Sequence, residues 1–121
     1  MNTARIQQNG KSIAVVDSAE VIIRDIQTAI DFAATIMYQE DCHRIALNKE
    51  AIAEEFFVLS SCLAGDILQK FVNYQVKFAI YGDFSIYTSK PLKDFIYESN
   101  RGNHVFFTDS KDTAVDKLSL V

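Results

Sequence analysis

A chain of 121 residues, 49% hydrophobic and 23% charged, has the length and composition of one globular domain rather than of a disordered segment. Its net charge of −4 and its lack of any lysine or arginine cluster argue against nucleic acid as a partner, because phosphate backbones bind concentrated basic faces. Segment 1–10 lacks the apolar core of a signal peptide, and no apolar run is long enough to cross a bilayer, so we expect a cytoplasmic protein with no membrane partner.

The first segment of the chain is typical of a β-hairpin. The dipeptide Asn9-Gly10 favours a two-residue type I′ turn, and it separates an expected strand over 4–8 from a returning strand over 12–17. Asp25 can then cap a helix, because its carboxylate can accept hydrogen bonds from the free N–H groups of a first turn. The apolar residues that follow recur at helical spacing and predict that helix.

The middle of the chain predicts two more strands on either side of a long helix. Strands are expected over 43–47 and 76–81, and the helix over 56–74. Segment 48–55 is expected to be a turn with a short helical piece. Within the long helix, Gly65 and its small neighbours predict that another backbone passes close by, since glycine is otherwise unfavourable in a helix.

The last third of the chain predicts a helix, a strand and a final helix. Ser89 can cap the first of these helices, and Pro91 fits its first turn because no amide donor is needed there. A strand over 104–107 follows, and Asp109 or Ser110 can cap the final helix.

Together these elements predict a single α/β domain over 1–121 with the order β-β-α-β-α-β-α-β-α. The expected inner strands are continuous apolar runs, which is typical of strands that are covered on both faces. Right-handed crossovers through the helices make such strands parallel. The fold class is therefore α/β, with a mixed, mostly parallel sheet, an N-terminal hairpin and helices packed on the sheet.

Sheets of this kind bind ligands beyond the carboxyl ends of their strands. Polar residues follow three of the expected strands, at 48–49, 82–85 and 108–110. Asp83 could orient a ligand or a partner at this place. The alternative is that Gly82-Asp83 is only a tight turn, which needs the same residue types.

A serine pair stands near the start of the long predicted helix. A phosphate on Ser60 or Ser61 would interact favourably with a helix N-terminus, so the pair is a candidate modification site. The alternative is that both serines are small residues that pack in a helix interface.

No motif for metal binding or for catalysis is present. The two histidines, His43 and His104, have no carboxylates at metal-ligand spacing, and Cys42 and Cys62 lie too far apart for a zinc or redox motif. The sequence also lacks the glycine-rich phosphate and dinucleotide loops and the serine-hydrolase motif. We therefore expect no metal, no cofactor and no catalytic residue.

Three phrases of the sequence are Leu59-Ser60-Ser61, Gly82-Asp83-Phe84-Ser85 and the run from Asp94 to Gly102. They resemble the bacterial domain-of-unknown-function family 4180. The resemblance covers almost the whole chain, and the family implies no established activity.

The order of the expected elements is similar to that of the STAS domain (sulfate transporter and anti-sigma factor antagonist). This resemblance implies a domain that binds partner proteins, in which a serine at a helix start is a phosphorylation switch. Ser60 or Ser61 would be the matching position. Leu59 precedes the pair and Cys62 follows it, where the STAS motif has aspartate and glycine.

The leading hypothesis is thus a non-enzymatic, STAS-like protein-binding or regulatory domain. Its candidate binding residues are Ser60, Ser61, Asp83, Phe84, Ser85, Glu98, Asn100 and Arg101.

Two other hypotheses remain open. One is a small enzyme with a pocket at the strand carboxyl ends that uses Asp83, Glu98 or His104. The other is a homo-oligomer joined through the hairpin edge or through the aromatic loop. The aromatic residues of that loop either mark an interface or cap the core beneath it; they are Tyr81, Phe84 and Tyr87.

Overall fold

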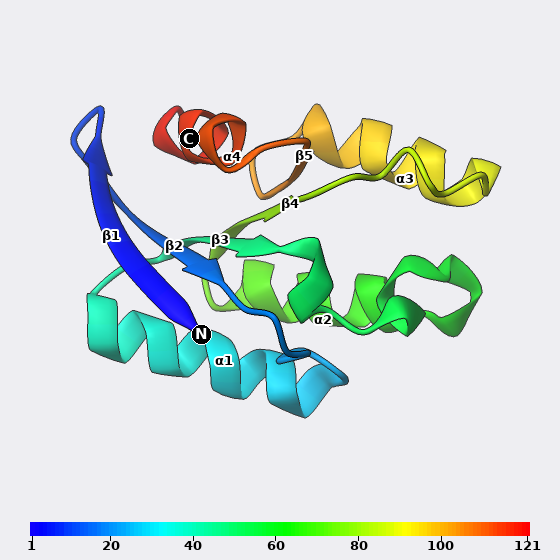
Figure 1. The fold of residues 1–121 in the computed structure, drawn as a ribbon, viewed down its shortest axis with the longest axis horizontal. Helices are drawn as coiled ribbons and strands as arrows, with labels where there is room; N and C mark the ends of the chain where they lie inside the picture. The colour runs from blue at the N-terminus through cyan, green and yellow to red at the C-terminus, as the bar shows by residue number, and fades with distance from the viewer.

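The computed structural model describes residues 1–121 and contains five strands and four α-helices in the predicted order (Figure 1). The strands are β1 (Asn2–Gln8), β2 (Lys11–Asp17), β3 (Arg44–Asn48), β4 (Lys77–Tyr81) and β5 (Val105–Thr108). The helices are α1 (Ile26–Glu40), α2 (Leu63–Asn73), α3 (Lys90–Asn100) and α4 (Lys111–Ser119). None of these helices has the length and the apolar character that crossing a bilayer requires.

All five strands form one sheet in the order β1-β2-β3-β4-β5. β1 and β2 pair antiparallel and every later pair is parallel, which confirms the predicted mixed, mostly parallel sheet. The hairpin turn places Asn9 and Gly10 at φ angles of 52° and 75°. Both angles are positive, as a type I′ turn requires, so this dipeptide sets the pairing of β1 with β2.

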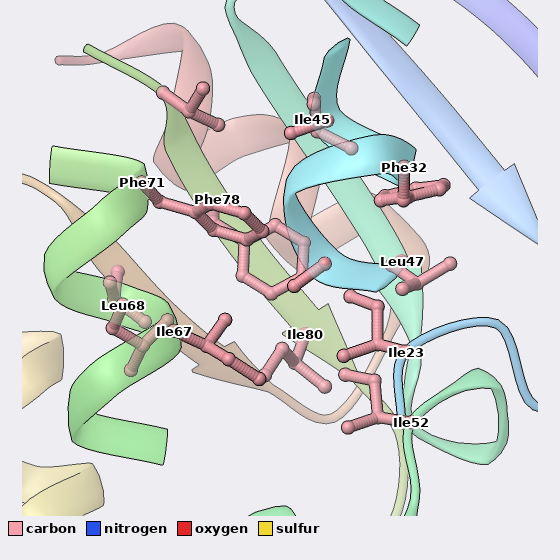
Figure 2. Close-up of a cluster of buried hydrophobic side chains, with 14 of the residues drawn as sticks. Ile23, Phe32, Ile45, Leu47, Ile52, Ile67, Leu68, Phe71, Phe78 and Ile80 are labelled. Carbon is pink, nitrogen blue, oxygen red and sulfur yellow. The ribbon is translucent and has the colours of Figure 1, made fainter. Parts of the chain in front are cut away.

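Helices cover both faces of the sheet. α1 and α2 lie together on one face over a cluster of 24 buried residues, whereas α4 covers the other face over a smaller cluster of nine (Figure 1). Side chains alternate between the faces along each strand, so Ile45 and Leu47 point toward α1 and α2 while Ala46 points toward α4. In the larger cluster, shown in Figure 2, Phe71 and Phe78 pack edge-on with ring centroids 5.0 Å apart.

The predicted helix caps at Asp25 and Ser89 are confirmed, and Ser110 is the cap of the final helix. The Asp25 carboxylate accepts a hydrogen bond from the Thr28 backbone N–H at 2.8 Å, and the Thr28 hydroxyl accepts one from the Asp25 N–H. Ser89 and Ser110 likewise each accept a hydrogen bond from a first-turn N–H. Local side-chain chemistry therefore sets where these helices begin.

The long helix predicted over 56–74 is wrong in its first third. α2 begins only at Leu63, and the preceding segments 54–57 and 59–61 are short 3₁₀ turns. Cys62, between the last turn and α2, has a left-handed φ of 65°, which interrupts a continuous α-helix.

Two buried aromatic residues explain this interruption. Phe56 and Phe57 are both almost fully buried, and their rings meet edge-on with centroids 5.1 Å apart. Phe57 also stacks on Tyr87, from the loop after β4, at 5.2 Å. Tertiary packing of these rings, rather than helical periodicity, therefore determines the path of the chain before α2.

Candidate binding surface at the carboxyl rim

The carboxyl ends of the parallel strands meet along one edge of the sheet. We call this edge the carboxyl rim; it consists of residues 17–18, 48–50, 82–85 and 108–110. The pairing of Asn48 with Tyr81, and of Tyr81 with Thr108, aligns these strand ends. The polar strand-end loops that the sequence indicated therefore lie side by side.

A buried asparagine joins the ends of β2 and β3. The Asn48 side chain accepts a hydrogen bond from the Ser18 N–H at 2.9 Å and donates one to the Ser18 carbonyl at 2.8 Å. Both groups are buried, so the amide satisfies backbone groups that would otherwise be unpaired where β2 ends. Asn48 is thus a structural residue of the rim.

Lys49 follows Asn48 and is also buried, with only 7% of its surface exposed. Its stem lies against Gly82, where an added Cβ would come within 2.8 Å of the Lys49 Cβ. Its ammonium lies over the rings of Tyr87 and Phe57, at 5.3 and 5.9 Å from their centroids, and 3.7 Å from a Glu54 carboxylate oxygen. Cation–π contacts and one ion pair therefore surround this buried lysine.

The Glu54 carboxylate also accepts a hydrogen bond from the loop after β4. The Tyr87 hydroxyl donates to Glu54 at 2.9 Å, so three side chains connect the two loops. Burial raises the pKa of Tyr87 well above its ordinary value, and the Glu54 carboxylate raises it further. The sequence placed Lys49 among the polar residues that follow the strands, but it predicted neither the burial of Lys49 nor the contact with Glu54.

Asp83 is an exposed carboxylate whose hydrogen bonds are local. It accepts hydrogen bonds from the hydroxyl and from the backbone N–H of Ser85, and these bonds lower its pKa. Asp83 and Ser85 line a shallow hollow of about 590 Å³ between the rim and α3, together with Asp109. A lowered pKa keeps this carboxylate charged at neutral pH, which suits recognition of a partner better than proton transfer.

The aromatic residues of the rim cap the core. Phe84 contacts Phe107 with ring centroids 5.5 Å apart, and Tyr87 stacks on Phe57. Tyr81 is buried, and its hydroxyl donates to the Val16 carbonyl at 2.8 Å. Burial, with the negative charges of Asp17 and Glu50, raises the pKa of Tyr81 to about 12.

An open cleft of about 430 Å³ separates the two loops on the outside of the molecule. Its walls combine apolar and small polar side chains: Glu54, Phe57, Val58, Leu59, Ser60, Ile86, Tyr87, Thr88, Ser89, Pro91 and Leu92. Val58 is 52% exposed and Ile86 is 61% exposed, so each wall presents an apolar side chain to solvent. Sequence patterns did not single out either residue, because a loop carries no periodicity that reports which side chain faces out.

The serine pair lies beside this cleft. Ser60 lines the cleft, and both serines belong to the last 3₁₀ turn before α2. The Ser61 hydroxyl donates to the Glu55 carbonyl at 2.8 Å and accepts from the Leu63 N–H at 3.2 Å. Both serines are exposed, but only Ser60 lines the cleft.

Residues 8–118 match the family described as Domain of unknown function (DUF4180). The chain belongs to this family. The DUF4180 region includes the whole carboxyl rim, the cleft and the serine pair, and it leaves out nearly all of β1. No curated protein and no solved structure matches the chain significantly.

Of the candidate residues of this DUF4180 chain only Ser60 lines the cleft, and three others lie away from the carboxyl rim as well. Glu98 lines a separate groove of about 260 Å³ between α2 and α3. The Asn100 amide hydrogen-bonds the backbone of Phe107 in β5. The Arg101 guanidinium stacks over the Tyr97 ring at 5.5 Å. The structure therefore gives Asn100 and Arg101 local packing contacts outside the rim.

The three residues of the enzyme hypothesis do not come together. Glu98 and His104 line the α2–α3 groove, whereas Asp83 lines the hollow at the rim. His104 precedes β5 and Asp83 follows the neighbouring β4, so roughly 13 Å of strand separates them at 3.3 Å per residue. Asp83 therefore lies apart from Glu98 and His104, which share the α2–α3 groove.

Neither histidine has a metal-binding neighbourhood. His43 and His104 both line a pocket at the amino ends of the strands, and the Lys77 ammonium lies 3.3 Å from His104 Nδ1. No group of three or more histidine, cysteine, aspartate or glutamate side chains is placed to hold a metal ion.

Gly65 also lines the α2–α3 groove, where an added Cβ would meet no atom within 4 Å, so the predicted close backbone at Gly65 is wrong.

Proposed function

We propose that this DUF4180 chain is a STAS-like, non-enzymatic protein-binding or regulatory domain of the bacterial cytoplasm. Its partner would dock on the cleft beside the carboxyl rim. The observation that carries the proposal is the exposure of Val58 and Ile86 on opposite walls of an open cleft. Exposed apolar side chains around a shallow depression are typical of protein interfaces.

The framework beneath the cleft supports this function. Lys49, Glu54 and Tyr87 connect the two loops through an ion pair, a hydrogen bond and ring contacts. The loops therefore keep their relative positions before a partner arrives, which lowers the entropy cost of binding. Asp83 and Phe84 lie on the same loop as Ile86, so the docking surface would extend along the rim to them.

The STAS resemblance supports the regulatory part of the proposal. The order of strands and helices agrees with that resemblance, and a serine pair directly precedes α2. Because Ser60 lines the cleft, a phosphate there would add negative charge to the docking surface itself. Modification of Ser60 would then control whether a partner binds.

Affinity capture from the native cytoplasm, with matched variants, tests the docking surface. Ile86→Asp and Tyr38→Asp both replace an exposed apolar side chain with a carboxylate, but only Ile86 lies on the cleft. We expect the wild type and Tyr38→Asp to retain the same partner and Ile86→Asp to lose it. With the purified partner, calorimetry should show at least a tenfold weaker Kd for Ile86→Asp, because hot spots cluster in such apolar centres.

Asp83→Ala is a second test, at the far end of the same proposed docking surface. Removing this exposed carboxylate should weaken binding less than Ile86→Asp does, because rim charges contribute little affinity. Capture of no partner would contradict the proposal. Capture that is unchanged by both Val58→Asp and Ile86→Asp would also contradict it.

A further inference from the structure

The two edges of the sheet differ in whether their outward-facing backbone groups are hydrogen-bonded within the chain. At the β5 edge, the Asn100 side chain donates to the Phe107 carbonyl at 3.1 Å and accepts from the Phe107 N–H at 2.7 Å. One amide thus makes the two hydrogen bonds that a neighbouring strand would make to this residue. The Asn100 amide therefore occupies the backbone groups of Phe107 that a strand added at the β5 edge would use.

The β1 edge is open. In a two-residue hairpin the residues that flank the turn, Gln8 and Lys11, form a hydrogen-bonded pair, and such pairs alternate along the ladder. The N–H and C=O groups of Thr3, Arg5 and Gln7 consequently point away from β2. No backbone or side-chain group of the chain outside this hairpin ladder hydrogen-bonds to them.

β1 also lacks the features that normally protect an edge strand. It has seven residues, one charged side chain (Arg5), no proline and no bulge in its pairing with β2. Exposed edges are usually short, highly charged or interrupted, because free strand edges pair with other chains. Figure 1 shows β1 as the outermost strand of the sheet, with α1 passing below it.

We propose that β1 pairs antiparallel with β1 of a second copy of this chain, so that the two sheets become one. The two-fold axis would pass between the Ala4 residues of the copies. Thr3 of each copy then lies opposite Arg5 of the other, and these two pairs exchange the backbone hydrogen bonds that are free in the single chain.

Side-chain size and charge favour this register. A two-fold axis at Arg5 would place two arginines directly opposite each other, which is unfavourable. An axis at Ile6 would oppose two isoleucines that already pack on the core beneath α4. An axis at Ala4 opposes two methyl groups at a position without hydrogen bonds, where Cα atoms approach to about 4.5 Å.

Charge complementarity supports a second copy as the occupant. Odd-numbered residues of β1 face the α1 side of the sheet, because Thr3 and Arg5 pair with Val16 and Ala14 of that cluster. On this side, Asp31 of α1 is exposed and lines a shallow hollow with Met1, the next odd-numbered residue along from Thr3. In the single chain the Arg5 guanidinium donates to the Glu40 carbonyl at 3.2 Å, and the Asp31 carboxylate accepts from the Gln27 side chain at 2.9 Å. In the dimer, Arg5 of the second copy, opposite Thr3, would exchange the Glu40 carbonyl for this carboxylate, and symmetry would make the contact twice.

The first test is the mass in solution, by light scattering after size exclusion and by sedimentation equilibrium. We expect twice the 13.7 kDa mass of one chain. Ala4→Glu opposes two carboxylates at the axis and should raise the dimer Kd at least tenfold, whereas Tyr38→Glu, at a 90% exposed position on α1, should leave it unchanged. A wild type that stays monomeric at several hundred micromolar would overturn the proposal, as would a dimer that Ala4→Glu leaves intact.

Charge reversal tests the register. Arg5→Asp and Asp31→Arg should each weaken the dimer, and the double variant should recover most of the affinity because both ion pairs are restored with opposite polarity. Circular dichroism checks that each variant is folded. A double variant as weak as the single ones would refute the proposed contact between Arg5 and Asp31.

A cross-link tests the axis directly. Ala4→Cys in a Cys62→Ser background should form a disulfide between copies on mild oxidation, because facing residues at such a position lie within disulfide reach. Cys62 is replaced because it is exposed, and Cys42 remains because it is buried. Tyr38→Cys in the same background is the control and should stay uncross-linked; equal cross-linking of both variants would argue against the axis at Ala4.

Discussion

Lys49 is buried at the end of β3 because its neighbours accept each part of its side chain. The stem packs on Gly82, which has no side chain of its own, and the ammonium group faces two aromatic rings and the Glu54 carboxylate. Long basic side chains often contribute through the packing of their stems as much as through charge. Glu54 is largely exposed, so solvent weakens its ion pair with Lys49.

Replacing Lys49 separates packing from charge. Lys49→Ala removes the stem and should lower the free energy of unfolding by about 2 kcal/mol, whereas Lys49→Met keeps most of the volume and should cost less than about 1 kcal/mol. Urea unfolding at neutral pH measures both. Equal losses for the two variants would mean that the charge, and not the stem, stabilises the rim.

Tyr81 makes stability depend on pH in the alkaline range. Its pKa is raised to about 12 in the folded chain, against about 10 for an exposed tyrosine. Between these values the unfolded chain loses this proton while the folded chain keeps it, so stability falls as the pH rises from 10 toward 12. Tyr81→Phe should therefore cost about 1 kcal/mol at pH 7, from the lost hydrogen bond to Val16, and should show a shallower alkaline decline.

At the scale of elements, Asn100 connects the end of α3 to the edge of β5. Asn100→Ala leaves the N–H and the C=O of Phe107 without a partner in the chain and should lower the free energy of unfolding by about 1–2 kcal/mol. Hydrogen exchange gives a site-specific readout, because the Phe107 amide should lose most of its protection. Ser99→Ala, one residue earlier, is the control, and an unchanged Phe107 exchange rate in Asn100→Ala would contradict the assignment.

The cap of α1 makes stability depend on pH in the acid range. Hydrogen bonds from the Thr28 backbone and side chain lower the pKa of Asp25 below its ordinary value near 3.9. A lowered pKa stabilises the fold above that value, and the contribution disappears as the pH falls through the folded-state pKa. Asp25→Asn keeps a capping side chain that does not titrate, so any advantage of the wild type over this variant should shrink below pH 4 in urea unfolding.

The sequence was sufficient for the elements whose signals are local. Apolar runs identified the inner strands, Asn9-Gly10 identified the hairpin, and Asp25 and Ser89 identified two helix starts, because each signal depends on neighbouring residues alone. The helix predicted for the segment before α2 was wrong because the path of that segment depends on residues far away in the sequence. Phe56 and Phe57 have a spacing that fits a helix, but the Phe57 ring stacks on Tyr87, thirty residues away, and that packing overrides propensity.

The candidate site, too, could be predicted from the sequence only where its position follows from the fold topology. Topology alone placed Asp83, Phe84 and Ser85 at the carboxyl rim, since all parallel strands end there. It could not reveal the buried Lys49, because burial of a lysine depends on ring and carboxylate partners from its own loop and from the loop after β4. Nor could it assign Asn100 to the sheet edge, which requires knowing which strand is outermost.

At the scale of the whole molecule, the proposed docking surface and the proposed dimer contact use different parts of the sheet. The cleft lies at the carboxyl ends of the inner parallel strands, and the dimer contact runs along β1. No residue belongs to both, so the two activities are expected to be independent, as distant substitutions usually are.

Crossed variants check this independence. Ile86→Asp should leave the dimer mass unchanged, and Ala4→Glu should leave partner capture within about twofold of the wild type, since additivity holds to a few tenths of a kcal/mol at such separations. Light scattering and calorimetry measure the two properties on the same preparations. A loss of partner binding in Ala4→Glu would show instead that docking needs both copies.

The Asn100 amide at the β5 edge also affects how far the proposed assembly through β1 could proceed. A subunit with only one free strand edge can pair with one neighbour, and in the resulting dimer both of these edges are used. Filaments and amyloid-like stacks need an adhesive margin on both sides of every subunit, so that each addition creates a new place to grow. In the proposed dimer, the Asn100 side chain on α3 would thus oppose growth at the second margin.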